Sequence, residues 1–289
     1  ISDRPLEINL REIAEVKRTW PDRAVIVSAM VESTREAWHD IIRRMPRLLV
    51  CNANTTEAVT QACAEAARAA ASPGTEIVAA TPRFGPKIIG TRVENAIAAH
   101  GMLDALAEQA PGCDAAILAV SYDTALEAAR QLLPIPVLGM TEAACLMACT
   151  VATRFGLVSY SQAAVYREVV AGHGLSARLS GVQVTGGSPA DAFANPAAMD
   201  ARILAAVERS AADGAEAVVL AGAAMAGAAA RLQPKAPVPL LDGIACAVVL
   251  AEALVRLKLP RASLGTLVRP ERESLGLSAP LAALLAGKA

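Results

Sequence analysis

A strand–helix–strand unit that occurs twice constrains what this chain can fold into more than any other feature. In its first copy, an apolar strand at residues 115–119 runs into a polar turn, Ser121-Tyr122-Asp123-Thr124, and then a helix. A second short apolar run, 135–138, leads to another helix at Thr141. Shifts of 102 and 103 residues superpose the two copies in these pairs: Gly112 and Gly214, Ala115 and Ala217, Leu118 and Leu220, Ala119 and Ala221, Pro134 and Pro237, Pro136 and Pro239, Leu138 and Leu241.

This period is longer than the roughly 20–50 residues of solenoid repeats. It predicts two related α/β halves that face each other across a pseudo-dyad, with the strand ends Val120 and Gly222 in equivalent positions. Ligands of open α/β sheets bind beyond the carboxyl ends of the strands, so both positions should border a site between the halves. A chance match between two Ala-rich βα units is the alternative explanation of the repeat.

Short apolar strands alternate with helices from residue 48 to about residue 257, which predicts parallel pairing. We therefore expect an α/β protein of two pseudo-symmetric Rossmann-like (flavodoxin-like) halves, with parallel sheets and a cleft between them. The expected units are residues 1–44, a first half of residues 45–153 plus 240–289, and a second half of residues 154–239. The tail from residue 258 should wrap the surface.

Composition excludes several kinds of function. The 289 residues carry a net charge of −1, which leaves no electrostatic footprint for nucleic acid or an anionic membrane. No uncharged apolar stretch reaches the roughly 20 residues that span a bilayer, and no signal segment is recognisable. The six cysteines form neither a dense framework nor a zinc-ligand pattern. We expect a cytoplasmic protein with reduced thiols and no metal.

Residues 1–44 differ from the remainder because they hold both tryptophans and are rich in charge. They predict a helix (10–19), a strand (24–28) and a second helix whose Ser33 and Glu36 have capping-box spacing. The segment resembles an internal piece of the flavin-dependent dihydropyrimidine dehydrogenase barrel, without that family's active-site part. The resemblance implies a stray fragment and no working flavin domain; a regulatory arm is the alternative.

Four segments in series carry a second resemblance: LLVCNANTT, GMTEAA, AVVLAGAAMAG and VPLLDG. They resemble the aspartate/glutamate/hydantoin racemase superfamily, and the hydantoin and allantoin racemase branch in particular, over residues 45–257. The resemblance implies two pseudo-symmetric halves, a cleft site, and catalysis without metal or organic cofactor. It also implies two catalytic cysteines, one removing the α-proton and the other returning it on the opposite face.

The two cysteine positions fall on Val120 and Gly222, neither of which can move a proton. Asp123 is a candidate general base or the N-terminal cap of the following helix. Tyr122, with an ordinary pKa near 10, is a candidate base or a wall of the cleft. Cys51 is the best-placed thiol for the site or a small buried residue. Three other cysteines fall in helices and are expected in the core: Cys145, Cys149 and Cys246.

Binding groups are better retained than the acid/base pair. Asn54, Thr55 and Thr56 precede a helix, whose N-terminus favours a substrate carboxylate or ureide. Glu142 and Asp242 either orient substrate amides or stabilise the first turns of their helices. The remaining candidate binding residues flank these positions and the strand ends: Ser121, Thr141, Gly222, Ala223 and Gly243. His100 and His173 lie near helix ends, where interaction with the helix dipole is the common role, and we expect neither in the site.

The sequence thus predicts a racemase-family protein that acts on a small carboxylate or a cyclic ureide such as hydantoin or allantoin by α-proton transfer. Both usual cysteine positions are replaced. A non-catalytic binding relative is one alternative, and a lyase or hydrolase using Ser121, Tyr122 or Cys51 is another. The sequence is compatible with a homo-oligomer, and we expect neither a nucleic-acid nor a membrane partner.

Overall fold

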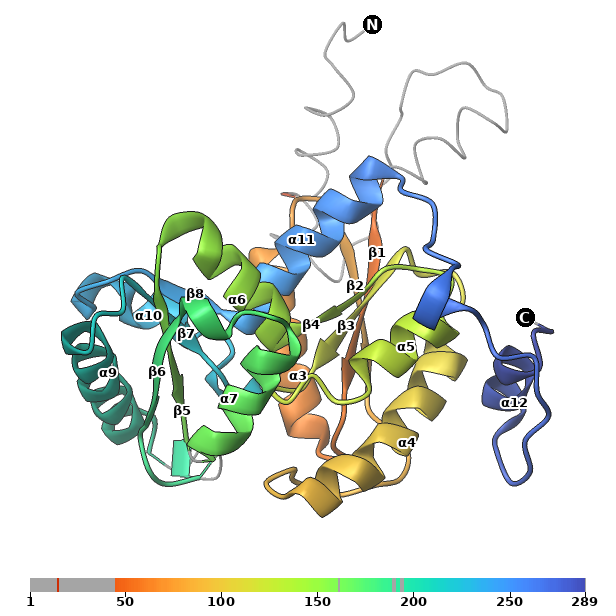
Figure 1. Ribbon diagram of the computed structural model, residues 1–289, viewed down its shortest axis with the longest axis horizontal. Coiled ribbons are helices and arrows are strands. Elements are labelled where there is room, and N and C mark those ends of the chain that lie inside the picture. The colour runs from red at the N-terminus through yellow and green to blue at the C-terminus, as the bar shows by residue number, and fades with distance from the viewer. Residues whose placement is uncertain (1–14, 16–44, 161, 189–190, 193–194, 289) are drawn as a thin grey trace, which may run out of the picture.

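The computed structural model describes residue 15 and residues 45–160, 162–188, 191–192 and 195–288. The helices and the strand expected within residues 1–44 therefore lie outside the described residues, apart from Glu15. In the described part, two parallel sheets stand side by side with helices between and around them (Figure 1). This arrangement confirms the expected α/β class with two related halves.

The first sheet has the strand order β2-β1-β3-β4, and all its pairs are parallel. Its strands are β1 (Arg47–Asn52), β2 (Glu76–Ala80), β3 (Ala115–Ala119) and β4 (Val137–Gly139). The second sheet repeats this order as β6-β5-β7-β8. Its strands are β5 (Phe155–Ser159), β6 (Leu179–Val184), β7 (Ala217–Leu220) and β8 (Leu240–Asp242).

Helices cover both faces of each sheet. The α-helices are α3 (Glu57–Ala70), α4 (Arg92–Gln109), α5 (Leu126–Leu132), α6 (Met140–Val151), α7 (Ala163–Gly172), α9 (Pro196–Ala212), α10 (Ala228–Leu232), α11 (Gly243–Leu257) and α12 (Ala279–Leu285). Short 3₁₀ turns are η1 (Ser176–Arg178), η2 (Ala223–Met225), η3 (Gln233–Lys235) and η4 (Gly265–Leu267). The tail after α11 contains η4 and α12, and α12 packs on α4.

Strand side chains alternate between two cores, as the period of two requires. In β1, Leu48 and Val50 enter a central core between the sheets, together with residues of α3, α6, α7 and α11. Leu49 and Cys51 point the other way, into the layer beneath α4 and α5. In the second half, α9 and α10 cover the corresponding outer face. The central core therefore joins the two halves into one molecule.

The repeat extends to individual hydrogen bonds. Asp114 donates its backbone N–H to the carbonyl of Arg47, and Glu216 donates to the carbonyl of Arg154. The two acidic side chains in turn accept backbone N–H groups at the start of β1 and just before β5. Ala116 and Val218 likewise donate to the carbonyls of Pro136 and Pro239. These matches support duplication over a chance likeness of Ala-rich segments.

The segment at the expected boundary near residue 240 pairs with the second sheet. Residues Leu240–Asp242 pair with β7 and belong to the second sheet, whereas the sequence division placed them in the first half. The helix that follows, α11, packs on α3, α6 and β3 of the first half. Strand pairing thus puts β8 in the second sheet, while α11 packs on the first half.

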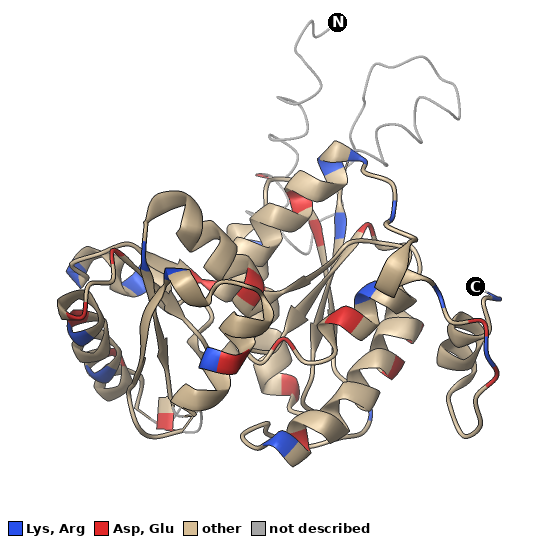
Figure 2. Ribbon diagram, in the orientation of Figure 1, with Lys and Arg blue, Asp and Glu red and all other residues tan. Residues whose placement is uncertain are grey.

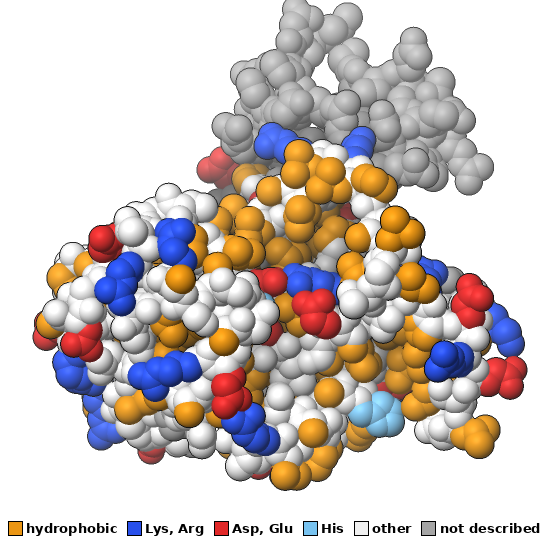
Figure 3. Space-filling model, in the orientation of Figure 1, with side chains coloured by type: hydrophobic (Ala, Val, Ile, Leu, Met, Phe, Trp, Pro, Cys, Tyr) orange, Lys and Arg blue, Asp and Glu red, His pale blue; other side chains and the backbone are white. Residues whose placement is uncertain are grey.

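The described surface is mixed in charge. Lys and Arg alternate with Asp and Glu over α9, α10 and the C-terminal segment, without a broad patch of one sign (Figure 2). On the face in Figure 3, hydrophobic side chains gather over α11. Val249 and Leu257 are exposed residues of this helix. Across the described ranges, no helix combines the length and apolarity needed to cross a membrane.

Candidate active site

A cavity of about 420 Å³ lies where the carboxyl ends of the two sheets face each other. Val120, which follows β3, and Gly222, which follows β7, both line it. The other lining residues come from both halves: Asn54, Thr56, Val59, Lys87, Ile88, Ile89, Gly90, Ala119, Ser121, Tyr122, Ser159, Tyr160, Tyr166, Gly187, Ser188, Ala223 and Ala224. The repeat thus located the cavity, because equivalent strand ends meet at it.

A row of hydroxyl groups crosses the cavity from one half to the other. Ser121 Oγ lies 2.7 Å from the hydroxyl of Tyr166, which also hydrogen-bonds Ser159. The Tyr122 ring meets the Tyr166 ring edge-on at 5.3 Å. Burial raises the pKa of Tyr166 to about 12, although its bonds to Ser121 and Ser159 lower it. Burial also raises the pKa of Tyr122. These hydroxyls are therefore suited to hydrogen bonding and are poor bases near neutral pH.

Tyr160 occupies the space beside Gly222. A Cβ atom added to Gly222 would lie 3.1 Å from Cε2 of Tyr160, which is closer than most real contacts. Tyr160 is 6% exposed and packs into the outer core of the second half. Val120, also 6% exposed, lines the cavity as well and packs into the outer core of the first half. Val120 has no group that can transfer a proton, and burial raises the pKa of the Tyr160 hydroxyl, so neither residue serves as a base near neutral pH.

Cys51 does not reach the cavity. Its side chain is fully buried in the outer core of the first half, and its thiol contacts the carbonyl of Asn52 at 3.4 Å. Burial raises the pKa of this thiol to about 12, so the thiolate that does nucleophilic or acid/base work is not populated. All six cysteines are free, and none of them lines the cavity.

The Asn54-Thr55-Thr56 turn uses most of its polar groups internally. Asn54 Oδ1 accepts the backbone N–H of Thr56 at 2.9 Å. Thr55 and Thr56 bond the carbonyls of Pro86 and Lys87, at 3.0 Å from the Thr55 backbone and 2.7 Å from the Thr56 hydroxyl. Asn54 and Thr56 border the cavity, and Thr55 does not. The turn therefore fastens the loop that carries Lys87.

Asp123 caps a helix, but a different one from the helix that sequence spacing indicated. Its carboxylate accepts the backbone N–H of Thr141 at 3.0 Å and that of Glu142 at 2.8 Å. These are the second and third residues of α6, whose own cap position is Gly139. Glycine is needed there because an added Cβ would lie 2.5 Å from the Asp123 carboxylate. The following helix, α5, has Ala125 at its cap position and no side-chain cap.

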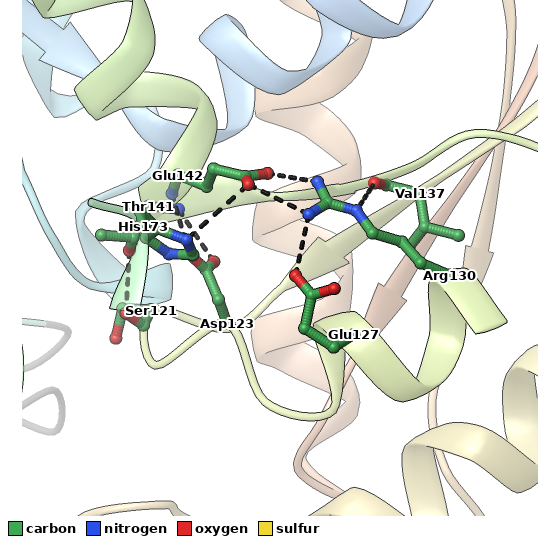
Figure 4. A network of polar contacts seen from close by, with 8 residues as sticks. All are labelled: Ser121, Asp123, Glu127, Arg130, Val137, Thr141, Glu142 and His173. Carbon is green, nitrogen blue, oxygen red and sulfur yellow. Dashed lines mark hydrogen bonds and ion pairs between the residues drawn. The ribbon is translucent and has the colours of Figure 1, made fainter. Parts of the chain in front are cut away.

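His173 joins this cap to the second half of the molecule (Figure 4). Its Nε2 lies 2.9 Å from Asp123 Oδ2, and its Nδ1 lies 3.7 Å from Glu142 Oε1. Glu142 also binds Arg130 through both carboxylate oxygens. The sequence places His173 near a helix end and outside the site. In the structure it lies one residue beyond α7 and is not among the residues that line the cavity, and it contacts Asp123 in the loop that follows Val120.

The charges of this network shift its pKa values. Burial lowers the pKa of His173, but the hydrogen bond and charge of Asp123 and the charge of Glu142 outweigh it and raise the pKa. Burial raises the pKa of Asp123, against the hydrogen bonds from His173, Thr141 and Glu142. Asp123 is absent from the cavity wall, so its contacts make it a support of the Ser121-Tyr122 segment and not a base facing a ligand.

Of the remaining candidates, Ala223 lines the cavity, and Thr141, Asp242 and Gly243 are not among the lining residues. Thr141 is buried and donates its hydroxyl to the carbonyl of Ser121 at 2.8 Å. Asp242 caps α11 by accepting the N–H groups of Ile244 and Ala245, and it also accepts that of Gly227. Gly243 packs against Met140, where a Cβ would lie 2.8 Å from the Met140 carbonyl oxygen. Ala223 lines the cavity beside Gly222.

Within the described residues, no group of three or more His, Cys, Asp or Glu side chains is arranged to hold a metal ion. What the geometry does provide is a pair of duplicated parallel α/β units that enclose a small-molecule cavity between their strand ends. This is the class of fold and site that racemases of amino acids and their derivatives share.

The comparisons with known proteins identify the family. A family profile described as Asp/Glu/Hydantoin racemase matches residues 48–251, and the chain belongs to this family. Hydantoin racemase of Pseudomonas sp. (strain NS671) is 30% identical over 78% of this chain and 93% of that protein. Hydantoin racemase of Paenarthrobacter aurescens is 34% identical over 73% of this chain and 92% of that protein.

Solved structures agree with this assignment. Allantoin racemase from Pseudomonas fluorescens superposes with a TM-score of 0.75 at 32% identity, over 79% of this chain and 99% of that one. A separate match of 45 residues, 47% identical, is to the chloroplastic dihydropyrimidine dehydrogenase of Arabidopsis thaliana and spans 11% of that protein. It agrees with the resemblance noted for residues 1–44.

Proposed function

We propose that the chain binds a small carboxylate or a cyclic ureide of the hydantoin or allantoin type in the cavity between its halves, without racemising it by a two-thiol mechanism. The observation that carries this proposal is the pair Val120 and Gly222. Both line the cavity between the halves, at the positions where the family resemblance puts the two cysteines. The names of the hydantoin and allantoin racemases that this chain resembles support the ligand class.

The polar part of the cavity suits such a ligand. Hydroxyls of Ser121, Tyr166 and Ser159 can donate to or accept from carbonyl oxygens and imide N–H groups. The flanking Val120 and Ala223 contribute apolar surface. A site of this kind, mostly apolar with a few convergent polar groups, is typical of small-molecule binding.

A lyase or hydrolase is less well supported. The Ser121 hydroxyl is hydrogen-bonded to Tyr166, whose raised pKa of about 12 leaves it protonated near neutral pH. An activated serine needs an adjacent base, and no His, Asp or Glu is among the residues that line the cavity. Cys51 is buried away from it.

Isothermal titration with allantoin and 5-benzylhydantoin tests binding. Proton exchange at C5 of the hydantoin, followed by NMR in D₂O at neutral pH, tests catalysis. We expect saturable binding, with exchange no faster than in a protein-free blank. Exchange that is enzyme-dependent and rapid would show that other groups move the α-proton.

A gain-of-function variant tests the mechanism. Val120→Cys with Gly222→Cys puts a thiol on each side of the ligand, and we expect C5 exchange to rise by about 10²-fold, the lower end for a positioned acid/base pair. Because Gly222→Cys crowds the Tyr160 ring, a companion variant adds Tyr160→Leu to restore space. Val120→Cys alone is the matched control, since inversion needs a group on each face. Equal inversion by the single and double variants would contradict the two-sided argument.

A further inference from the structure

Among the described residues that line the cavity, Lys87 is the one with a formally charged side chain. It is exposed, and its ammonium group has no hydrogen-bond or ion-pair partner within the described part of the chain. A cation without a partner beside a concave, mostly apolar site attracts an anionic ligand group. Lys87 was not among the residues that the sequence pointed to, because a single lysine in a loop carries no motif.

The other charges near this loop are already paired. Arg92 binds Glu168 of the second half at 2.6 Å. Glu94 is used by the capping box of α4, where it accepts the N–H groups of Gly90 and Thr91. Arg83 binds Asp104 and Glu108. Lys87 therefore differs from its neighbours in having its charge available for a ligand.

The backbone holds Lys87 at the cavity. Its own carbonyl accepts the Thr56 hydroxyl, and the preceding carbonyl of Pro86 accepts the Thr55 backbone N–H. These bonds anchor the loop to the turn between β1 and α3. The conformational entropy lost when Lys87 is ordered by a ligand is then confined to its side chain, because its backbone is already fixed.

Apolar side chains continue from Lys87 into the cavity. Ile88 is 53% exposed and Ile89 is half-buried, and both line the cavity with Val59 and Tyr122. A ligand held by its anionic end at Lys87 would meet these four side chains with the rest of its body. The surface thus matches an acid that carries an apolar substituent.

We propose that Lys87 is a specificity-determining residue and that the preferred ligand is a carboxylate with an apolar substituent, chosen over the uncharged cyclic ureide. The inference rests on the proposed function in that it uses the same cavity. It goes further by assigning the preference to the anionic carboxylate over the uncharged ureide, because of the positive charge of Lys87.

A matched pair of ligands tests this preference. N-carbamoyl-phenylalanine is the ring-opened form of 5-benzylhydantoin, with the same substituent and an added carboxylate. In titration calorimetry at pH 7 we expect the acid to bind about tenfold more tightly than the hydantoin, as one charge-assisted contact allows. Its affinity should fall as salt is raised, and that of the hydantoin should not.

Substitution of the lysine gives the second readout. Lys87→Gln should weaken binding of the acid about tenfold and leave the hydantoin within about twofold. Lys87→Arg should keep the preference. Lys235→Gln is the matched control, because it removes one exposed lysine charge from η3, outside the cavity. Circular dichroism and thermal unfolding check that each variant is folded.

The outcomes separate the inference from the proposed function. Tight binding of the hydantoin, with the acid no better and Lys87→Gln without selective effect, would overturn the inference and leave the proposed function intact. Binding of neither compound would overturn both. Weaker binding of the acid, with binding of the hydantoin unchanged, in Lys87→Gln and not in Lys235→Gln supports the assignment.

Discussion

Replacing Asp123 by Asn should destabilise the protein strongly, because Asp123 caps α6 from outside that helix. The carboxylate receives three donors: the N–H groups of Thr141 and Glu142 at 3.0 and 2.8 Å, and His173 Nε2 at 2.9 Å. Asparagine has the same shape but one acceptor oxygen. One of the two backbone N–H groups must then face an NH₂ group in a buried site, since Asp123 is only 7% exposed.

The size of the effect follows from these contacts. A buried donor left without an acceptor costs about 1–3 kcal/mol, and loss of a helix cap alone costs about 1 kcal/mol. Loss of the charged partner of His173 adds to this at pH values where the imidazole is protonated. We expect about 2–4 kcal/mol in all, a large part of the roughly 5–15 kcal/mol that stabilises a typical domain.

Urea unfolding of both proteins at pH 6 is the assay. With a slope of about 2 kcal/mol per molar urea, the midpoint should fall by about 1–2 M. Glu127→Gln is the matched control, because Glu127 lies in the same network but is 74% exposed; its effect should stay within about 0.5 kcal/mol. An Asp123→Asn midpoint equal to that of the Glu127→Gln variant would refute the capping argument.

Two further predictions concern stability. Gly156→Ala should lower the free energy of unfolding by about 1–3 kcal/mol through overpacking, since its Cβ would lie 1.8 Å from Ser210 Oγ. The control is Gly181→Ala, at the paired position of β6, where an added Cβ meets open space. Thermal unfolding should show this control to be close to neutral. Because the pKa of His173 is raised in the fold, its stabilising contribution is complete below its unfolded pKa of about 6.5 and is lost as pH rises through the folded value. The advantage of wild type over His173→Gln in urea should therefore shrink between pH 6 and pH 9, and a constant difference would argue against the ion pair.

Local sequence features were enough to predict the fold. Apolar runs such as 115–119 became strands within a residue or two, because a short buried run between turn residues has few other conformations. Thr91 and Glu94 form a capping box on α4, a start signal that the sequence itself carries. The repeat, with its recurring Pro-x-Pro, predicted that Val120 and Gly222 border the same site, because equivalent residues of duplicated units occupy equivalent positions. Both residues line the cavity.

Contacts between distant segments could not be predicted in the same way. Asp123 lies close in sequence to α5, yet its carboxylate caps α6, because its backbone has a positive φ of 48° and turns the side chain towards Gly139. His173 reaches Asp123 across 50 residues, and nothing in Gly-His-Gly indicates that partner. Cys51 was placed correctly at a strand end, but the alternation of β1 sends its thiol into the outer core.

The close contact between Gly243 and Met140 restricts how the two halves can move relative to each other. There the first turns of α6 and α11 touch, and the two helices continue packed together behind the cavity. The chain passes from one half to the other directly through these helices. A rigid-body opening of the two halves would therefore break the contact between α6 and α11. A ligand must therefore enter the cavity without separation of these two helices, past lining residues such as Lys87 and Gly187.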